Sequence, residues 1–489
     1  MVPVGGAQLR QGPTHADRSH RPPCVAGPLP WRARRRDGLR GDVVNDLDEL
    51  QQLADDVVGL VGDRAEANVR ATRTRHGLTR FANSSIHQHV GEDTRQVAIT
   101  VSVDGRTAST STSDVDRAAL GALVDRTIEA ARVQPRDPGW PGATPPVEVP
   151  RAGNHDDETA AADPAARAAL VAAFVEAGPA LRAAGFCDTE RTAAAFTSTA
   201  GHRARGQATR ATLDGIHQTD TSAGGAHATS FRLADLDATA VGSLAADRAR
   251  RSATAVDLDP GTYPVVLGPE AVATIATFLA FYGFNAKAHH EGASFARIGE
   301  PQFDPAVTLA AAPDDPRAIG LPFDAEGSPR RSYPLVEEGV TRHLAHDRRT
   351  AALAGDATTG DAVPGGEGFG AIPTTVLLAP GASSPDAMVA SMERGLLVTQ
   401  FHYCRILDPK SQVVTGLTRN GTFLVEDGEV VGAVGNLRFT QSFLGALAAG
   451  QVLAVGDDDR YADGEFGPGM VIAPSIQLAG WNFTGGARG

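Results

Sequence analysis

The chain has 489 residues, 42% of them hydrophobic, and a formal net charge of −13 at pH 7. This length favours two or three domains, and no stretch reaches the roughly 18–20 uninterrupted apolar residues of a membrane-spanning helix. The acidic balance argues against a nucleic-acid binder. The three cysteines, Cys24, Cys187 and Cys404, are far apart and define no disulfide framework, so we expect a reducing, cytoplasmic location.

The first 42 residues are rich in Pro, Gly and Arg and lack the apolar core of a secretory signal. We expect this segment, residues 1–42, to be disordered or to come from a misassigned start rather than to direct targeting. From residue 43 to residue 255 the pattern predicts an N-terminal α/β domain with an antiparallel sheet and helices. Its first helix is indicated by apolar residues spaced three and four apart: Leu47, Leu50, Ala54, Val57 and Val61.

Strands follow this helix. The segments 65–74, 77–90 and 95–113 have the composition of strands, and we expect Gly-containing turns between them, such as Asp104-Gly105. Ser113 followed by Asp116 is typical of a capping box that starts the next helix. The rest of the domain is predicted as follows: an irregular Pro/Gly-rich connector over 134–158, a helix opened by Asp163-Pro164, short strands within 186–231, and a helix over 234–250.

Beyond residue 255 the pattern changes, and residues 256–489 are predicted to form a mostly-β, barrel-like domain. A strand, a turn and a strongly apolar helix are expected over residues 259–284. Further strands are indicated over 374–381, 395–406, 412–434 and 475–480. The expected fold class is therefore α+β with two domains.

The segment "AKAHHEGASF", residues 286–295, contains His289, His290 and Glu291 side by side. A zinc-protease helix reads H-E-x-x-H, because residues four apart share one helical face and can bind one metal. Counting from His290, that position holds Ser294, so the second ligand is missing. We predict a solvated helix end here.

Two other pairs of residues could carry chemistry. His343 and His346 have a spacing that permits metal binding, but no cysteine or carboxylate cluster lies beside them. His402 and Cys404 would share one face of a regular strand, which would permit a nucleophile–base pair. A small buried cysteine beside a surface histidine is the favoured interpretation.

Asp324 and Glu326 in "PFDAEG" could serve as paired carboxylates, although acids flanking a glycine turn are commonly structural. The Gly-rich segment 363–373 follows no strand-to-helix pattern, so we predict a loop near a cleft rather than a phosphate cradle. The serine-hydrolase motif G-x-S-x-G is absent, as are a Walker loop and a dinucleotide fingerprint. Residue chemistry alone therefore defines no catalytic site.

The order of several segments resembles the TldD/PmbA family over roughly residues 45–485. The matching segments are "GLTRFANSSIHQHV", "DPGTYPVVLGPEAV", "GLPFDAEGSPRR", "GLTRNGTFLVEDGEV" and "GNLRFTQSF". The resemblance implies an N-terminal α/β domain and a C-terminal barrel-like domain. It also implies one of two branches: a TldD branch that binds zinc through H-E-x-x-x-H and a late cysteine and hydrolyses peptides, or a PmbA/TldE branch that lacks these ligands and pairs with a TldD-type subunit.

The zinc ligands of the TldD branch are missing here. The family places them on the helix after "VVLGP", residues 265–269, and the late segment 466–480 contains no cysteine. The side chains that this helix offers instead are Thr274, Thr277, Phe278, Phe281 and Tyr282. The resemblance therefore implies a non-catalytic, TldE/PmbA-like subunit without a cofactor of its own. Its TldD-type partner would supply zinc, and the heterodimer would act on peptides or unfolded segments.

Within this interpretation, Asp324, Glu326 and Arg419 are candidate residues of the chamber or its rim, and Arg419 is expected to be buried against one of the two acids. Two alternatives stay open. One is a self-sufficient hydrolase with an irregular site formed by His290, Glu291, His402 or Cys404. The other is a ligand-binding or scaffold protein in a specialised biosynthetic pathway. Substrate, partner identity, and homodimer or heterodimer formation are not determined by the sequence.

Overall fold

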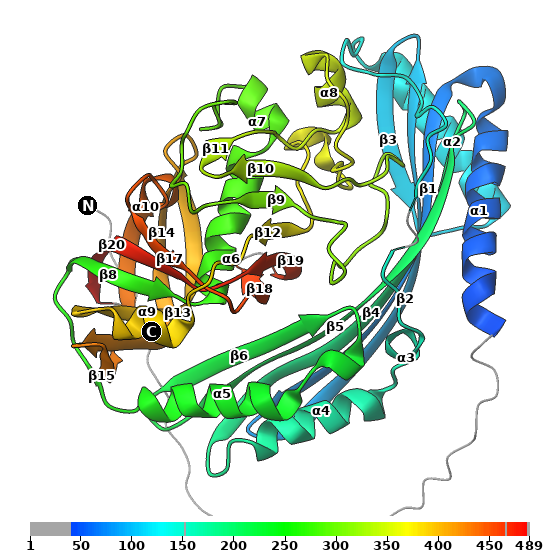
Figure 1. The fold of residues 1–489 in the computed structure, drawn as a ribbon. Helices are drawn as coiled ribbons and strands as arrows, with labels where there is room; N and C mark the ends of the chain where they lie inside the picture. The colour runs from blue at the N-terminus through cyan, green and yellow to red at the C-terminus, as the bar shows by residue number, and fades with distance from the viewer. Residues whose placement is uncertain (1–40, 151–152, 465–466, 487–489) are drawn as a thin grey trace, which may run out of the picture.

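The computed structural model describes residues 41–150, 153–464 and 467–486. The predicted extension, residues 1–42, lies outside the described residues except for its last two. Figure 1 shows an N-terminal part in which a long, curved sheet wraps around a C-terminal part rich in short strands. The predicted α+β class, with an antiparallel sheet and helices followed by a barrel-containing region, is confirmed.

The N-terminal sheet is antiparallel throughout, with strand order β3-β2-β1-β4-β5-β6. β1 runs without a break through Gly77, so the turn expected there is wrong; a Cβ at Gly77 would lie 2.5 Å from Arg167 Nη1. The chain turns at Asn83-Ser84 instead, both with positive φ, and at Asp104-Gly105 as predicted. The strands are β1 (Glu66–Ala82), β2 (Ser85–Val103), β3 (Arg106–Thr112), β4 (Arg182–Ser198), β5 (Arg203–Gln218) and β6 (Ala223–Ser230).

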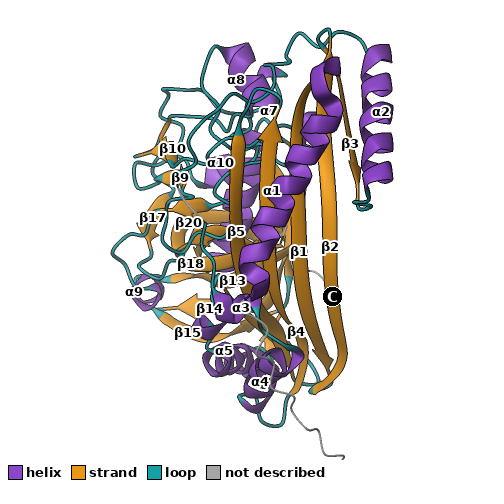
Figure 2. Ribbon diagram, turned by 90° about the vertical axis from the view of Figure 1, so that its right-hand side faces the viewer, coloured by secondary structure: helices purple, strands orange, loops and turns teal. Residues whose placement is uncertain are grey.

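The helices of this part cover the convex face of the sheet (Figures 1 and 2). Side chains alternate along β1, so Val69 and Ala71 pack against the first two helices at one end, and Phe81 packs against α4 at the other. Asp116, not Ser113, caps α2 by accepting from the backbone N–H of Ala119. The helices are α1 (Gly41–Val61), α2 (Arg117–Val133), α3 (Asp157–Ala160), α4 (Pro164–Glu176) and α5 (Ala238–Arg251), with 3-10 turns at Gly62–Arg64 and Leu233–Asp235.

The C-terminal part contains a small, closed β-barrel of mixed strand direction. The strands follow the order β13-β8-β20-β16-β14, and β14 pairs back with β13. β8 and β13 are parallel, whereas the other pairs are antiparallel. Stacked aromatic rings fill the interior, with Phe401 and Trp481 centred 4.9 Å apart. The strands are β8 (Gly261–Leu267), β13 (Arg394–Asp408), β14 (Val413–Glu426), β16 (Leu437–Ser442) and β20 (Ile476–Gly486), flanked by β7 (Ala255–Val256), β15 (Glu429–Val434) and β17 (Val452–Val455).

A second sheet, in the order β11-β10-β9-β12-β19-β18, lies beside the barrel. Its strands are β9 (Leu309–Ala311), β10 (Tyr333–Glu337), β11 (Val340–Thr341), β12 (Val376–Leu378), β18 (Arg460–Gly464) and β19 (Gly467–Ala473). Short helices connect these elements: α7 (Ala286–His290), α8 (Arg348–Ala354), α9 (Pro385–Ala390) and α10 (Phe443–Ala446), with a 3-10 turn at Gly366–Gly368.

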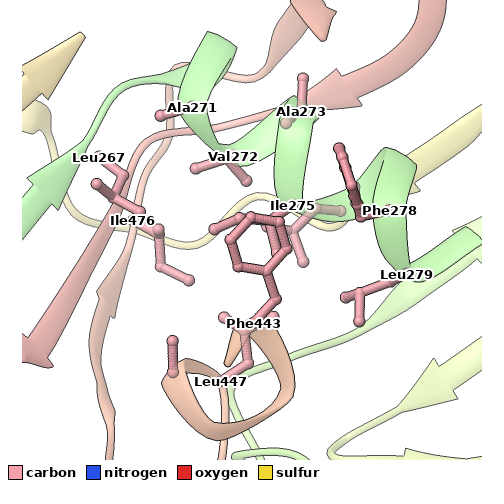
Figure 3. Close-up of a cluster of buried hydrophobic side chains, with 14 of the residues drawn as sticks. Leu267, Ala271, Val272, Ala273, Ile275, Phe278, Leu279, Phe443, Leu447 and Ile476 are labelled. Atoms are coloured by element: carbon pink, nitrogen blue, oxygen red, sulfur yellow. The ribbon is translucent and has the colours of Figure 1, made fainter. Parts of the chain in front are cut away.

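The predicted apolar helix is α6 (Pro269–Phe278), which packs between the barrel and the second sheet and continues as a π-helical turn, Leu279–Gly283. All ten residues of α6 are buried, which explains why it is apolar on every side. Figure 3 shows Val272 and Ile275 of α6 in one cluster with Phe443 and Ile476.

The predicted domain boundary, between residues 255 and 256, falls inside β7. β7 pairs with β15 of the C-terminal part, which favours a boundary just before β7. We therefore propose that the domain boundary lies just before β7. Among the described helices, none combines the length and apolar character that crossing a membrane requires.

Candidate functional site

The polar side chains of α6 are already engaged within the protein. The hydroxyl of Thr274 donates to the carbonyl of Glu270 at 3.1 Å, and that of Thr277 donates to the carbonyl of Ala273 at 2.7 Å. Such bonds back to the preceding turn are usual for threonine in a helix. The ring of Phe278 meets that of Phe443 edge-on. These side chains belong to the helix and the core.

Glu270, in the first turn of α6, is the centre of a buried charge cluster. Its Oε1 lies 2.5 Å from Arg460 Nη2 on β18 and 3.4 Å from His227 Nδ1 on β6. Burial alone would raise the pKa of Glu270, but Arg460, His227 and Arg248 outweigh it and hold that pKa at about 2. Burial lowers the pKa of His227 to about 4. Near neutral pH the cluster therefore holds a carboxylate anion and a neutral imidazole.

A polar pocket of about 240 Å³ lies over this cluster, between the N-terminal sheet and the barrel; we call it the helix pocket. Besides Glu270 and His227, its lining includes Asp214 from β5, His402 from β13 and Asn420 from β14. No Ser, Thr, Cys, Lys or Tyr is among the described residues that line it. The polar side chains that line the helix pocket can bind a polar group by hydrogen bonds.

These residues do not fit a zinc site. Zinc in proteins takes cysteine, histidine or carboxylate ligands converging on one point. On α6 the only such side chain is Glu270, whose carboxylate is held by Arg460. Within residues 41–150, 153–464 and 467–486, no group of three His, Cys, Asp or Glu side chains could hold a metal ion.

The segment of His289, His290 and Glu291 is a helix end, as predicted. α7 has five residues, Glu291 is its C-cap, and all three side chains are exposed. Glu291 is engaged by Lys287 one turn earlier. The other histidine pair lies in a loop, where His343 is exposed and His346 is buried, so the two do not face one common site.

The expectation that His402 and Cys404 share one face of a regular strand is wrong. A bulge separates them, because Tyr403 between them has a φ of 55° and the pairing with β14 shifts there. Cys404 is 1% exposed and belongs to the barrel core, whereas His402 lines the helix pocket. The favoured interpretation, a buried cysteine near a more exposed histidine, agrees with this arrangement.

The expected pairing of a buried Arg419 with Asp324 or Glu326 is also wrong. Arg419 is exposed on β14, where its Nη1 lies 2.5 Å from His402 Nε2. Asp324 instead accepts backbone N–H bonds from Glu326, Ser328 and Ala362. The reason is topological, since the "FDAEG" loop lies against the N-terminal sheet and not beside the barrel.

Glu326 lines a second cavity, of about 460 Å³, which we call the strand pocket, and Asp324 lies two residues earlier in the same loop. One wall is formed by β1, β2 and β3, and the other by loops of the C-terminal part. Residues 363–367 of the Gly-rich segment line it, which confirms the predicted loop near a cleft. Burial and the neighbouring Asp324 raise the pKa of Glu326 to about 8, so it is mostly protonated at neutral pH.

Sequence reasoning missed three residues in or beside these pockets: Arg70, His227 and Arg460. Arg70 lies on the polar side of β1, opposite Val69 and Ala71, so the alternation of β1 could have placed it on the concave face. The other two carry no local signal, because they meet Glu270 only through the packing of three separate elements.

Two models of one family match the chain. The PmbA/TldA metallopeptidase C-terminal domain matches residues 260–485, and PmbA/TldA metallopeptidase domain 1 matches residues 67–131. Together they span more than half of the chain.

Three solved structures share the fold, each with a TM-score of 0.77 and with 99% of its own chain covered. One, from Thermotoga maritima, is described as a proposed modulator of a DNA gyrase; it is 19% identical and covers 88% of this chain. TldE from Thermococcus kodakarensis is 17% identical, and a proposed modulator of DNA gyrase from Bacteroides thetaiotaomicron is 18% identical; each covers 90% of this chain. The fold thus agrees along nearly the whole of each structure, and with the two family models it shows that this chain belongs to the PmbA/TldD metallopeptidase family.

Proposed function

We propose that this chain is a TldE-like, non-catalytic subunit of a cytoplasmic heterodimeric peptidase, in which a TldD-type partner supplies the zinc. The observation that carries the proposal is α6. At the place where the resemblance puts zinc ligands, this helix has hydroxyls bonded to its own backbone and a phenyl ring packed in the core. The likeness to the fold of TldE supports the same branch.

The contribution of this chain is to bind and enclose the substrate. The helix pocket and the strand pocket both open between the curved sheet and the C-terminal part, and both have polar side chains in their lining. Such polar side chains can hydrogen-bond the backbone of a peptide or an unfolded segment. Enclosing a proteolytic zinc ion between two subunits would spare folded proteins.

Co-expression with a TldD-type protein from the same genome tests the proposal. We expect a stoichiometric complex by native mass spectrometry, zinc bound in the partner, and peptide hydrolysis that requires both chains. A matched control is the partner carrying a substitution in its H-E-x-x-x-H motif, which should assemble but not hydrolyse.

Three results would contradict the proposal. One is the absence of a complex, and another is unchanged hydrolysis by the partner alone. The third is stoichiometric zinc and peptidase activity in the isolated chain, which would favour the self-sufficient hydrolase. His290→Ala would then identify the site, although the exposure of His290 on α7 gives that alternative no support.

A further inference from the structure

Arg70 in the strand pocket is a charged side chain that no residue of the described ranges binds directly, although the carboxylate of Asp324 lies near enough to raise its pKa against the effect of burial. It lies on the concave face of β1 and is partly buried, and its Nε is buried without a hydrogen bond. No hydrogen bond or ion pair joins its guanidinium to another residue in the described ranges. Buried arginines are nearly always paired, because an unpaired buried charge is costly. The free donors of Arg70 therefore indicate a binding partner from outside the chain.

The opposite side of the strand pocket is acidic. Asp347, which caps α8, and Glu367, which is exposed in the Gly-rich loop, both line the cavity with Glu326. The remaining arginine of the lining, Arg349, is already paired with Asp137 at 2.5 Å. One cavity thus combines an unpaired guanidinium with carboxylates that can attract an ammonium group.

We propose that the strand pocket binds a short zwitterionic peptide, with the C-terminal carboxylate on Arg70 and the amino group toward Asp347 and Glu367. The planar guanidinium matches a carboxylate with two parallel hydrogen bonds. Between the two ends, the polar side chains of Gln96, Thr100 and Ser111 can bond the peptide backbone. A cavity of about 460 Å³ lies within the roughly 300–1,000 Å³ usual for small-ligand sites.

The carboxylates of Asp347 and Glu367 disfavour ligands that carry only negative charge. A phosphate or nucleotide would bring several negative charges next to the carboxylates of Asp347 and Glu367, and like charges at short range repel. A zwitterion brings one charge of each sign and matches both sides. The inference rests on the proposed function only for its choice of peptides, since it concerns binding by this chain without a partner.

Isothermal titration of the isolated chain tests the inference, with trialanine and Ala-Gln-Ala as probes. We expect at least one of them to bind, and amidation of its C-terminus to weaken binding about tenfold or more. Acetylation of the amino group should weaken it by a smaller factor. Arg70→Gln should weaken the free peptide about tenfold and leave the amide unchanged. The control Arg80→Gln, an exposed arginine on the same strand and face, should bind like the wild type.

Arg70→Lys separates a folding defect from a binding defect, because it keeps the charge but not the two-pronged geometry, and its binding should be intermediate. The fluorescence of Trp140, which lines the pocket, should change on binding, and Trp140→Phe should remove that change. Equal binding of free and amidated peptide, wild-type binding by a folded Arg70→Gln, or binding of neither probe would overturn the inference. None of these outcomes depends on complex formation, so the inference and the proposed function can fail separately.

Discussion

The helix pocket and the strand pocket lie between the same two parts of the molecule, but they differ in how their charged side chains are paired. In the helix pocket, Glu270 is ion-paired with Arg460 and lies beside His227, so the protein supplies its own counter-charges. In the strand pocket, Arg70 has no directly bound counter-charge among the described residues, and burial together with the nearby Asp324 raises the pKa of Glu326. The first arrangement is typical of a structural contact between domains, and the second of a site completed by a ligand.

Removing one member of the paired cluster should have the largest effect on stability. Arg460→Met leaves the carboxylate of Glu270 buried without its closest cation, so it must keep an uncompensated charge or take up a proton. We expect the free energy of unfolding to fall by about 3–5 kcal/mol, measured by urea denaturation.

The matched control for Arg460→Met is Asp247→Asn, which breaks the exposed pair of Asp247 with Arg251 and should cost less than about 1 kcal/mol. If both substitutions had the same small effect, the helix-pocket cluster would not be a structural contact, and the contrast between the two pockets would be lost.

A second substitution tests how the strand pocket is built. Gly327 has a φ of +78°, and a Cβ there would lie 2.5 Å from the ring of Phe196 on β4. Gly327→Ala should therefore move the "FDAEG" loop off the sheet and lower the free energy of unfolding by about 2–3 kcal/mol. Gly292→Ala is the control, since its φ is also positive but its Cβ would meet nothing within 4 Å. Equal melting temperatures of the two variants would contradict this account of the loop.

The fold was predictable where a local pattern reflects a local environment. The spacing from Leu47 to Val61 gave α1, and the uniform apolar run gave the buried α6. The continuity of β1 through Gly77 was not predictable, because the guanidinium that packs against Gly77 belongs to Arg167 of α4, far along the chain. Closure of the barrel by β13 and β14 likewise depends on long-range pairing.

The candidate site was less predictable than the fold. The Gly-rich loop and the helix-end histidines could be interpreted from composition and spacing. The bulge at Tyr403 could not, since a positive φ in a non-glycine residue leaves no clear trace in the sequence. The Glu270–Arg460 pair joins residues 190 positions apart, which no local motif reports.

The pH dependence of the free energy of unfolding tests the raised pKa of Glu326 in the strand pocket. The raised pKa of Glu326 means that the folded state binds a proton more tightly than the unfolded state, so stability falls as pH rises from about 4.5 to about 8. Each unit of pKa difference is worth about 1.4 kcal/mol. Glu326→Gln keeps an acceptor for the backbone N–H of Arg348 but cannot ionise. It should lie within about 1 kcal/mol of the wild type near pH 5 and exceed it by up to about 4 kcal/mol near pH 8.

Chemical denaturation across this pH range measures the effect of Glu326→Gln. Glu367→Gln is the control, because this exposed residue lines the same pocket and should change stability by less than about 0.5 kcal/mol at either pH. If the free energies of unfolding of Glu326→Gln and the wild type changed in parallel from pH 5 to pH 8, the pKa of Glu326 would not be raised in the folded protein.

The smallest effect on stability is expected at Arg419, outside both buried clusters. Its side chain is exposed and contacts His402 at the rim of the helix pocket, so Arg419→Ala should change the free energy of unfolding by less than about 0.5 kcal/mol. Arg419 would then act in binding a partner that covers the rim of the helix pocket, and not in stabilising the fold. We expect Arg419→Ala to weaken assembly with a TldD-type partner while the isolated chain melts as before, with Arg80→Gln as an exposed arginine control. If assembly were unchanged, the rim would be no part of the interface, and Arg419 would be an ordinary surface residue.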